Sequence, residues 1–421
     1  MHRRIWILLS IVMFAQARAA SECMQAAEQK KYPEAYVACQ QEASAGDALA
    51  QYTLGTLYEQ GLGAPQDFQA AVKWYEAAGR QGHLNAQFNA GILYQFRLNQ
   101  PDQAKPWFEK AAEQGDGEAA LNLGSMYRDG IGVKQDLQQA EKWYEQGAKA
   151  GVIKAQFSLA NLYRYGPPAV QNDALAYYWY SQAANGKGPK ALLSGSVDAL
   201  YEMGRMLMEG KGRPRNHVQA AQMFQKAADM GMLNALGMLG AMTVMGDGVE
   251  QDTQQGLQML QKSVEGGYYH AANLLGGLYE VGYLDIPVDL EQAITWHTLA
   301  AQHGEVASEN ALGNIYQQRQ NWALAVQWYQ KAANHGNAQA QGNLGYLYVT
   351  GTGVQKDSGL AFMYFTQAAG QGLATAQRNL ALMYELGEGT AVNLDQARLW
   401  YRKAAAQGDA DAAEALERLA P

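Results

Sequence analysis

Residues 47–82 read DALAQYTLGTLYEQGLGAPQDFQAAVKWYEAAGRQG, and this stretch decides the fold of the chain. Leu54 and Tyr58 lie four residues apart, which places both side chains on one stripe of a helix. Gly55 lets a partner helix approach closely, because only a hydrogen atom stands where other residues carry a side chain. The glycines at positions 61 and 63 permit positive φ angles, so we expect the first helix to end there.

A second helix is indicated downstream of this glycine turn. Asp67 has the side chain of a helix N-cap, which accepts hydrogen bonds from the free amides of the first turn. Trp74 and Tyr75 follow among alanines, and bulky side chains beside small ones pack two antiparallel helices together. The helical register predicts that both aromatic residues belong to the core.

The same pattern recurs along the chain and defines ten repeats. In the third repeat, Leu123-Gly124, Trp143-Tyr144 and Gly151 stand at the corresponding offsets. The closing glycines are 32–37 residues apart except across one insertion, and they are Gly46, Gly82, Gly115, Gly151, Gly186, Gly195, Gly231, Gly267, Gly304, Gly336, Gly372 and Gly408. These motifs resemble the Sel-one-like repeat, a longer relative of the tetratricopeptide repeat. The resemblance implies an all-α fold, a right-handed superhelical α/α solenoid of about ten repeats and roughly twenty-two helices.

Departures from the pattern suggest how the chain is divided. Repeats 2 and 8 lack the glycine turn and shrink to tetratricopeptide length, and the insertion around Pro189 is the candidate hinge. We expect a secretory signal peptide (1–19), an N-terminal helical hairpin (20–46), repeats 1–4 (47–186), the connecting insertion (187–195), repeats 5–10 (196–408) and a C-terminal cap (409–421).

The first residues have the composition of a secretory signal. A basic head at 2–4 precedes an apolar run at 5–14, and small residues at Ala17 and Ala19 favour cleavage after Ala19. An uncleaved membrane anchor is the alternative, although the run is about half the length that a bilayer-spanning helix needs. We therefore expect a periplasmic or secreted protein with no transmembrane segment after cleavage.

Cys23 and Cys39 are the two cysteines, and they lie at nearly equal distances on either side of the expected turn at 31–33. They should therefore face each other. In an oxidising compartment this arrangement predicts a disulfide that closes the first hairpin, which no preceding repeat covers. Two buried free thiols or a metal site are the alternatives, and a metal site is disfavoured because no histidine lies nearby.

The charge balance is acidic and excludes nucleic acid as an expected partner. The chain contains 32 Lys+Arg and 40 Asp+Glu residues. Cleavage after Ala19 leaves 29 bases against 40 acids, a net charge of −11. Binding to phosphates depends on a basic surface, which this composition does not provide.

Familiar catalytic motifs are missing from the sequence. It contains no His-Glu-x-x-His run, no Gly-x-Ser-x-Gly elbow and no phosphate loop ending in Gly-Lys-Ser/Thr. One repeated position is acidic in several repeats, and there we expect helix caps rather than acid–base catalysts: Asp67, Asp136, Asp252 and Asp357. We therefore expect neither enzyme activity nor a cofactor, with a carboxylate-dependent hydrolase as the remaining catalytic alternative.

The resemblance to Sel-one-like repeats implies a function in binding. Similar proteins act as scaffolds whose concave face, lined by the first helices, grips a peptide or another protein. We expect a protein-protein interaction scaffold or adaptor of the bacterial cell envelope, with an envelope protein as partner. A factor that binds acidic polysaccharide or assists exopolysaccharide secretion is the alternative.

Partner-binding residues are expected where the repeat does not fix the side chain. Two such positions come directly after the structural glycine and directly after Tyr58 or its equivalents. In repeats 3, 4, 5 and 8 they hold Arg128, Arg164, Arg205, Asn161 and Asn314. The arginines predict a local basic groove for carboxylates or an acidic glycan, unless acids such as Glu118 or Glu202 pair with them. A further set could hydrogen-bond an extended peptide or neighbouring backbone groups: Asn89, Asn122, Asn343 and Asn379.

Overall fold

The computed structural model describes residues 21–186 and 194–419. The expected signal peptide lies outside these residues, as does most of the candidate hinge at 187–195. The chain divides into two compact units, an N-terminal unit that ends at Asn216 and a C-terminal unit that begins at His217. The described residues form 23 helices and no strand, apart from one isolated bridge between Tyr283 and Ile286. The predicted all-α fold is therefore confirmed.

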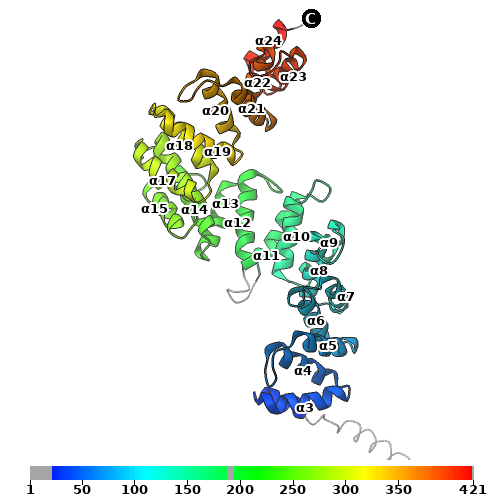
Figure 1. Ribbon diagram of the computed structural model, residues 1–421. Helices are drawn as coiled ribbons and strands as arrows, with labels where there is room; N and C mark the ends of the chain where they lie inside the picture. The colour runs from blue at the N-terminus through cyan, green and yellow to red at the C-terminus, as the bar shows by residue number, and fades with distance from the viewer. Residues whose placement is uncertain (1–20, 187–193, 420–421) are drawn as a thin grey trace, which may run out of the picture. The chain divides into compact units, whose positions relative to one another are not determined.

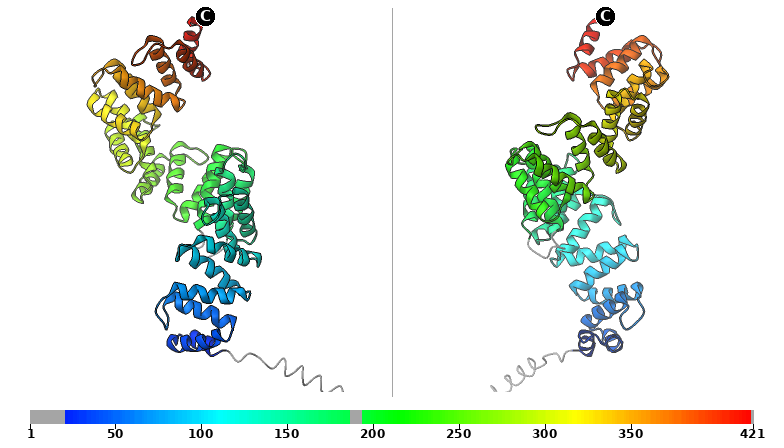
Figure 2. Two further views of the ribbon diagram at one scale, coloured as in Figure 1. Left: turned by 45° about the vertical axis from the view of Figure 1, so that its right-hand side comes forward. Right: turned by 90° about the vertical axis from the view of Figure 1, so that its left-hand side faces the viewer.

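The N-terminal unit stacks helix pairs in chain order (Figures 1 and 2). The helices are α2 (Glu22–Glu28), α3 (Tyr32–Ser44), α4 (Ala48–Gln60), α5 (Phe68–Arg80), α6 (Leu84–Phe96), α7 (Pro101–Glu113), α8 (Gly117–Asp129), α9 (Leu137–Lys149), α10 (Ile153–Tyr165), α11 (Asp173–Ala184) and α12 (Ser194–Glu209). In repeats 1 to 4, the even-numbered helix is the first of the repeat and the odd-numbered helix is the second.

The C-terminal unit continues the same arrangement. Its helices are α13 (His217–Asp229), α14 (Leu233–Met245), α15 (Thr253–Glu265), α16 (His270–Val281), α17 (Leu290–Gln302), α18 (Val306–Gln318), α19 (Trp322–Asn334), α20 (Ala338–Thr350), α21 (Ser358–Gly370), α22 (Ala374–Leu386), α23 (Leu394–Ala405) and α24 (Ala410–Arg418). The last helix follows the tenth repeat. Among the described helices, none is both long and apolar enough to cross a membrane.

The helices begin and end where the sequence predicts. The Asp67 side chain accepts hydrogen bonds from the amides of Gln69 and Ala70, both at 2.9 Å. The same cap is formed by the other acids at this position, namely Asp136, Asp252 and Asp357. Gly61 ends α4 with a φ of 69°, as expected of a left-handed C-cap. The acids at this position therefore cap helices, as predicted.

In most repeats the core contains an aromatic ring from the second helix, whereas repeat 6 has Leu260 at this position. A Cβ on Gly55 would lie 2.7 Å from the ring of Tyr75, so only glycine allows α4 to approach α5 this closely. Tyr75 is fully buried, but Trp74 is half-buried. The prediction that both residues of the pair belong to the core is therefore confirmed for the tyrosine, while Trp74 packs from a half-buried position against the cluster of Ala50 and Leu54. Neighbouring helical residues point about 100° apart, so the two rings pack against different neighbours.

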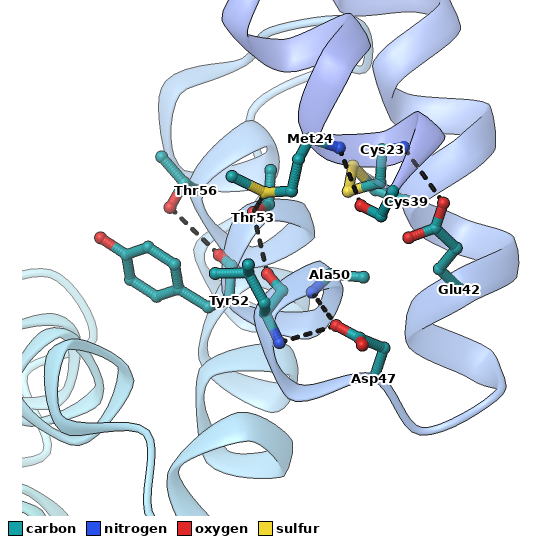
Figure 3. Close-up of a disulfide and its surroundings, with 11 residues drawn as sticks. Cys23, Met24, Cys39, Glu42, Asp47, Ala50, Tyr52, Thr53 and Thr56 are labelled. Atoms are coloured by element: carbon teal, nitrogen blue, oxygen red, sulfur yellow. Dashed lines mark hydrogen bonds between the residues drawn. A yellow bond between two sulfur atoms is a disulfide. The ribbon is translucent and has the colours of Figure 1, made fainter. Parts of the chain in front are cut away.

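The N-terminal hairpin is closed by the predicted disulfide between Cys23 on α2 and Cys39 on α3 (Figure 3). Both cysteines are fully buried, and the Glu42 carboxylate accepts a hydrogen bond from the backbone amide of Cys23 at 3.1 Å. Residues Ala50 and Leu54 of the first repeat belong to the same buried cluster. The disulfide thus fixes the hairpin on which the first repeat packs.

Candidate functional site

In repeats 1, 3, 4, 8 and 10, one or two side chains of the first helix lie close to the hydroxyl of the buried tyrosine. We call the residue directly after the structural glycine, or after the alanine that replaces it in repeats 4 and 10 (Ala160 and Ala381), the +1 position and the residue three places later the +4 position. In repeat 1, the Tyr75 hydroxyl donates to Glu59 at +4 (2.6 Å) and also lies within hydrogen-bond distance of Thr56 Oγ1 at +1 (3.1 Å). Burial raises the pKa of Tyr75, and the hydrogen bond to Glu59 raises it further, so the hydroxyl remains a donor.

Asn161 and Asn314 both occupy the +1 position, in repeats 4 and 8. The Tyr180 hydroxyl donates to Asn161 Oδ1 at 2.5 Å, and the Tyr329 hydroxyl donates to Asn314 Oδ1 at 2.8 Å. Asn161 is half-buried and Asn314 is exposed. Both amides therefore join the two helices of their own repeat, and their contact with a partner remains a prediction.

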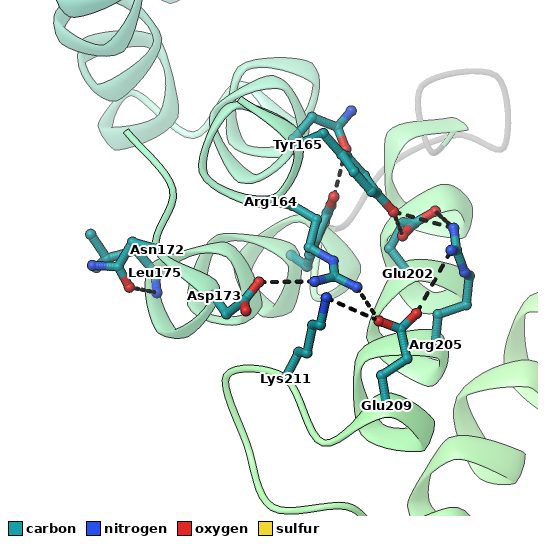
Figure 4. Close-up of polar contacts among 11 residues, drawn as sticks. Arg164, Tyr165, Asn172, Asp173, Leu175, Glu202, Arg205, Glu209 and Lys211 are labelled. Carbon is teal, nitrogen blue, oxygen red and sulfur yellow. Dashed lines mark hydrogen bonds and ion pairs between the residues drawn. The ribbon is translucent and has the colours of Figure 1, made fainter. Parts of the chain in front are cut away.

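Arg164, at the +4 position of repeat 4, is a buried residue with only 7% exposure. One nitrogen of its guanidinium donates to Asp173 at 2.9 Å, and another donates to Glu209 at 2.5 Å. Asp173 begins α11 and Glu209 ends α12, so Arg164 on α10 joins three helices of the N-terminal unit (Figure 4). The structure therefore gives this arginine a folding role that the sequence did not indicate.

Arg205, at the +1 position of repeat 5, lies beside Arg164, and the two share Glu209 (Figure 4). A second acid, Glu202, lies 3.3 Å from the Arg205 guanidinium. The Tyr165 hydroxyl bridges Glu202 and Arg205, since it donates to the carboxylate and accepts from the guanidinium. Arg164 and Arg205 are thus parts of one network in which the acids compensate the positive charge.

Arg128 pairs with its neighbour Asp129 at 2.7 Å. This hydrogen bond lowers the pKa of the Asp129 carboxyl, which therefore stays ionised. Among the ion pairs of the described residues, Arg128 shares no acid with Arg164 or Arg205. All three arginines have acidic partners, as the alternative interpretation of the sequence held, so an unpaired basic groove is not present at these residues.

A set of buried glutamines joins successive repeats, and sequence reasoning missed it. The Gln51 amide, on α4, donates to the carbonyl of Ala43 on α3 at 3.1 Å and accepts from Gln81 at 2.9 Å. Equivalent bonds recur at Gln87, Gln341 and Gln377. The detectable signal is a glutamine four residues before the structural glycine. These amides satisfy buried backbone carbonyls and are not available to a partner.

In repeat 7 a histidine replaces the buried tyrosine, and its contacts resemble those of a catalytic group. His297 Nδ1 lies 3.1 Å from Ser308 Oγ, and Nε2 lies 3.5 Å from Glu280. However, Ser308 is fully buried and donates its proton to Asn273 at 2.8 Å. A nucleophile must be reachable and must lose its proton to the base, so this group is a polar core network and not a reaction site.

The +1 positions of repeats 9 and 10 are apolar and exposed. Tyr346 on α20 has 59% exposure, and Leu382 on α22 has 42%. The buried ring of repeat 9 is Phe365, which has no hydroxyl to satisfy. Together with Val349 and Met383, these residues line a cavity of about 190 Å³. Sequence reasoning missed this region because it looked for charged and amide side chains at these positions.

Comparison with known proteins identifies the family of the chain. Ten segments match the family model of the Sel1 repeat, at 48–83, 84–116, 117–152, 153–187, 197–232, 233–268, 270–305, 307–337, 338–373 and 374–409. Among curated proteins no match was found.

Solved structures include similar chains. One is a protective antigen of uropathogenic Escherichia coli with an SLR fold, which is 29% identical over 91% of this chain and 90% of that chain, with a TM-score of 0.49. Another is a Sel1 repeat protein from Oxalobacter formigenes, which is 24% identical over 91% of this chain and 90% of that chain, with a TM-score of 0.44.

Proposed function

This chain belongs to the Sel1 repeat family, and from this premise we propose that it is a non-enzymatic scaffold that holds protein partners in the bacterial cell envelope. Sel1 repeats commonly mediate protein–protein interactions. In stacked repeats, the side chains that packing does not fix form a continuous surface, and partners bind there.

One observation carries the proposal, namely the chemical variety of the +1 position. A capping Asp or Asn and a buried ring recur in most repeats, but the +1 residue varies. In repeats 1, 3, 4, 5, 8, 9 and 10 the +1 residue is Thr56, Ser125, Asn161, Arg205, Asn314, Tyr346 and Leu382, respectively. Folding alone does not require this variety, since several of these side chains are exposed. A surface with varied chemistry on a uniform framework is suited to recognising a specific protein.

Two features support export. The disulfide between Cys23 and Cys39 fits an oxidising compartment such as the periplasm or the cell exterior. The basic head and apolar run at the start of the sequence have the pattern of a secretory signal. The acidic-polysaccharide alternative draws no support from Arg128, Arg164 and Arg205, because acids compensate all three guanidiniums.

Site-specific photocrosslinking in the native host tests the proposal. A photoreactive amino acid is introduced at the +1 positions 56, 125, 346 and 382, one at a time. As a control it is placed at Leu399, which is 41% exposed on the second helix of repeat 10. We expect an adduct with one protein partner from at least one +1 position and none from Leu399. Equal adducts at all positions, or none anywhere, would refute the scaffold proposal.

A further inference from the structure

The chemistry of a partner can be inferred from a difference between repeats. In repeats 1, 3, 4 and 8, the hydroxyl of the buried tyrosine is hydrogen-bonded to a polar +1 residue. The pairs are Tyr75 and Thr56, Tyr144 and Ser125, Tyr180 and Asn161, and Tyr329 and Asn314. In repeat 9 both members are replaced, by Phe365 and Tyr346. Repeat 9 therefore has an apolar surface where these four repeats have a satisfied polar pair.

This apolar surface is hollowed into a pocket bordered by α20, α21 and α22. Phe365 is 2% exposed and closes the pocket from α21, while Tyr346 and Leu382 border it from the other two helices. Its volume of about 190 Å³ is smaller than the ~300–1,000 Å³ typical of small-molecule sites. The pocket therefore suits a single side chain of a partner and not a metabolite or cofactor.

The exposed apolar residues beside the pocket indicate that the side chain it receives is itself apolar. Leu386 lies one helical turn after Leu382 on α22 and is 56% exposed, so the apolar surface continues beyond the pocket. Contiguous exposed apolar side chains mark interaction sites, and an aromatic or aliphatic anchor in a pocket supplies much of the binding energy at interfaces. A leucine, methionine or phenylalanine would fill the space.

The charge around the pocket is negative. Glu388 lines it, and neither lysine nor arginine is among its lining residues. In the described part of the chain Glu388 forms no ion pair, unlike Glu385, which Arg418 engages. From His217 onward the sequence has 10 Lys+Arg against 19 Asp+Glu. Complementary charge guides association and penalises partners of the wrong sign, so a basic segment is favoured.

We propose that the pocket formed by Tyr346, Phe365 and Leu382 receives one aliphatic or aromatic side chain of a partner polypeptide that carries lysine or arginine next to this anchor. The inference rests on the scaffold function and specifies its partner. Asn379 also lines the pocket, and its amide can donate to and accept from the backbone of an extended segment. Glu388 pairs with the basic residue beside the anchor.

Peptide binding to the purified chain tests this proposal. The probes are fluorescent peptides of about ten residues with a central leucine, methionine or phenylalanine, flanked by lysines in one set and by glutamates in the other. We expect the lysine-flanked set to bind at least about tenfold more tightly, and the preference to weaken with added salt. Equal affinity of the two sets would overturn the charge assignment.

Three variants test whether the peptides bind at this pocket. Leu382→Gln should weaken binding of the lysine-flanked peptides at least about tenfold. The double variant Tyr346→Thr, Phe365→Tyr rebuilds the polar pair of repeat 1. It should also weaken binding of these peptides at least about tenfold. Leu399→Gln is the matched control, because Leu399 is 41% exposed against 42% for Leu382 but lies on the second helix of the same repeat. Leu399→Gln should bind the peptides with the affinity of the parent. Both Leu399→Gln and Leu382→Gln should keep the melting temperature of the parent.

The remaining outcomes separate this inference from the scaffold function. Crosslinks to a partner at positions 56 or 125, together with unchanged peptide affinity of Leu382→Gln, would overturn the pocket and leave the scaffold standing. Absence of crosslinks anywhere would refute the scaffold itself. If sedimentation shows a dimer of this chain that Leu382→Gln dissociates, the surface binds a second copy and the proposed basic partner is wrong.

Discussion

Repeats 8 and 9 are neighbours that share the Leu-Gly motif of the first helix, at 312–313 and 344–345, yet their first helices present different surfaces. In repeat 8, the Tyr329 hydroxyl lies 2.8 Å from Asn314 Oδ1 and 2.9 Å from Gln317 Oε1, so either oxygen can accept its proton. In repeat 9, Phe365 needs no acceptor, and Tyr346 is 59% exposed at the corresponding position. In this pair of repeats, a core hydroxyl goes with a +1 side chain that serves the fold, and its absence goes with a +1 side chain that is exposed.

In repeats 4 and 5, side chains at the +1 and +4 positions also serve the fold, as Asn314 does in repeat 8. Arg164 is held by Asp173 and Glu209, and Arg205 shares Glu209 with it. These side chains hold neighbouring helices together, although they occupy the positions from which a partner would be bound. Polar residues at the +1 and +4 positions are therefore weaker indicators of binding in this chain than apolar ones.

The largest effect is expected from Tyr329. Tyr329→Ala removes a fully buried ring and should destabilise the C-terminal unit by about 3–5 kcal/mol, whereas Tyr329→Phe keeps the ring and should cost only about 1 kcal/mol. Asn314 and Gln317 are exposed, so water can satisfy them after the hydroxyl is lost. Urea denaturation of the full chain measures both. If the two variants were equally destabilised, the hydroxyl and not the ring would dominate, and the contrast with repeat 9 would fail.

An intermediate effect is expected from the arginine network. Arg164→Ala leaves Asp173 and Glu209 without their shared buried partner, and charged hydrogen bonds of this kind contribute about 1.5–3 kcal/mol. Arg205→Ala breaks more exposed contacts and should cost about 1 kcal/mol or less. Hydrogen exchange of α10 to α12 in the two variants provides the measurement. Equal loss of protection in both would show that burial does not distinguish the arginines.

The repeat, the caps and the disulfide could be predicted because each depends on residues close in sequence. Asp67 caps the helix that begins at the next residue, and Cys23 and Cys39 flank one turn. The role of Arg164 could not be predicted, because Glu209 lies 45 residues away and only the fold brings them together. The arginines at first-helix positions of three neighbouring repeats therefore suggested a basic groove, but in the structure acids pair with all three.

The aromatic residues show a second limit of sequence reasoning. The pattern showed that one face of the second helix packs on the first, but it could not decide between Trp74 and Tyr75, which differ by one residue. It also could not separate an exposed apolar residue such as Leu382 from a core residue, because both are simply hydrophobic in the sequence. Burial, which decides both cases, depends on the packing of neighbouring repeats.

The smallest effect is expected from Glu385 in repeat 10, where the hydroxyl of the buried tyrosine is satisfied from the +4 position. Tyr401 donates to Glu385 at 2.9 Å, which leaves Leu382 at +1 free to be apolar. Glu385 also accepts hydrogen bonds from Arg418 of the last helix, and chiefly for this reason its pKa lies below the ordinary value. A carboxyl with a lowered pKa in the folded state stabilises the fold above the pKa of the unfolded state, about 4.3 for glutamate, and this contribution is lost as the pH falls through the folded value.

Glu385→Gln keeps an acceptor for Tyr401 but removes the charge that Arg418 binds. The variant should therefore melt slightly below the parent at pH 7, and the difference should disappear as the pH falls below about 4. Thermal unfolding of both proteins from pH 7 to pH 3 measures this, and hydrogen exchange of α24 locates it. A difference that persists at pH 3 would mean that the side chain acts through packing and not through its charge. In that case the ion pair is incidental, and the hydrogen bond from Tyr401 alone accounts for the position of Glu385 beside an apolar Leu382.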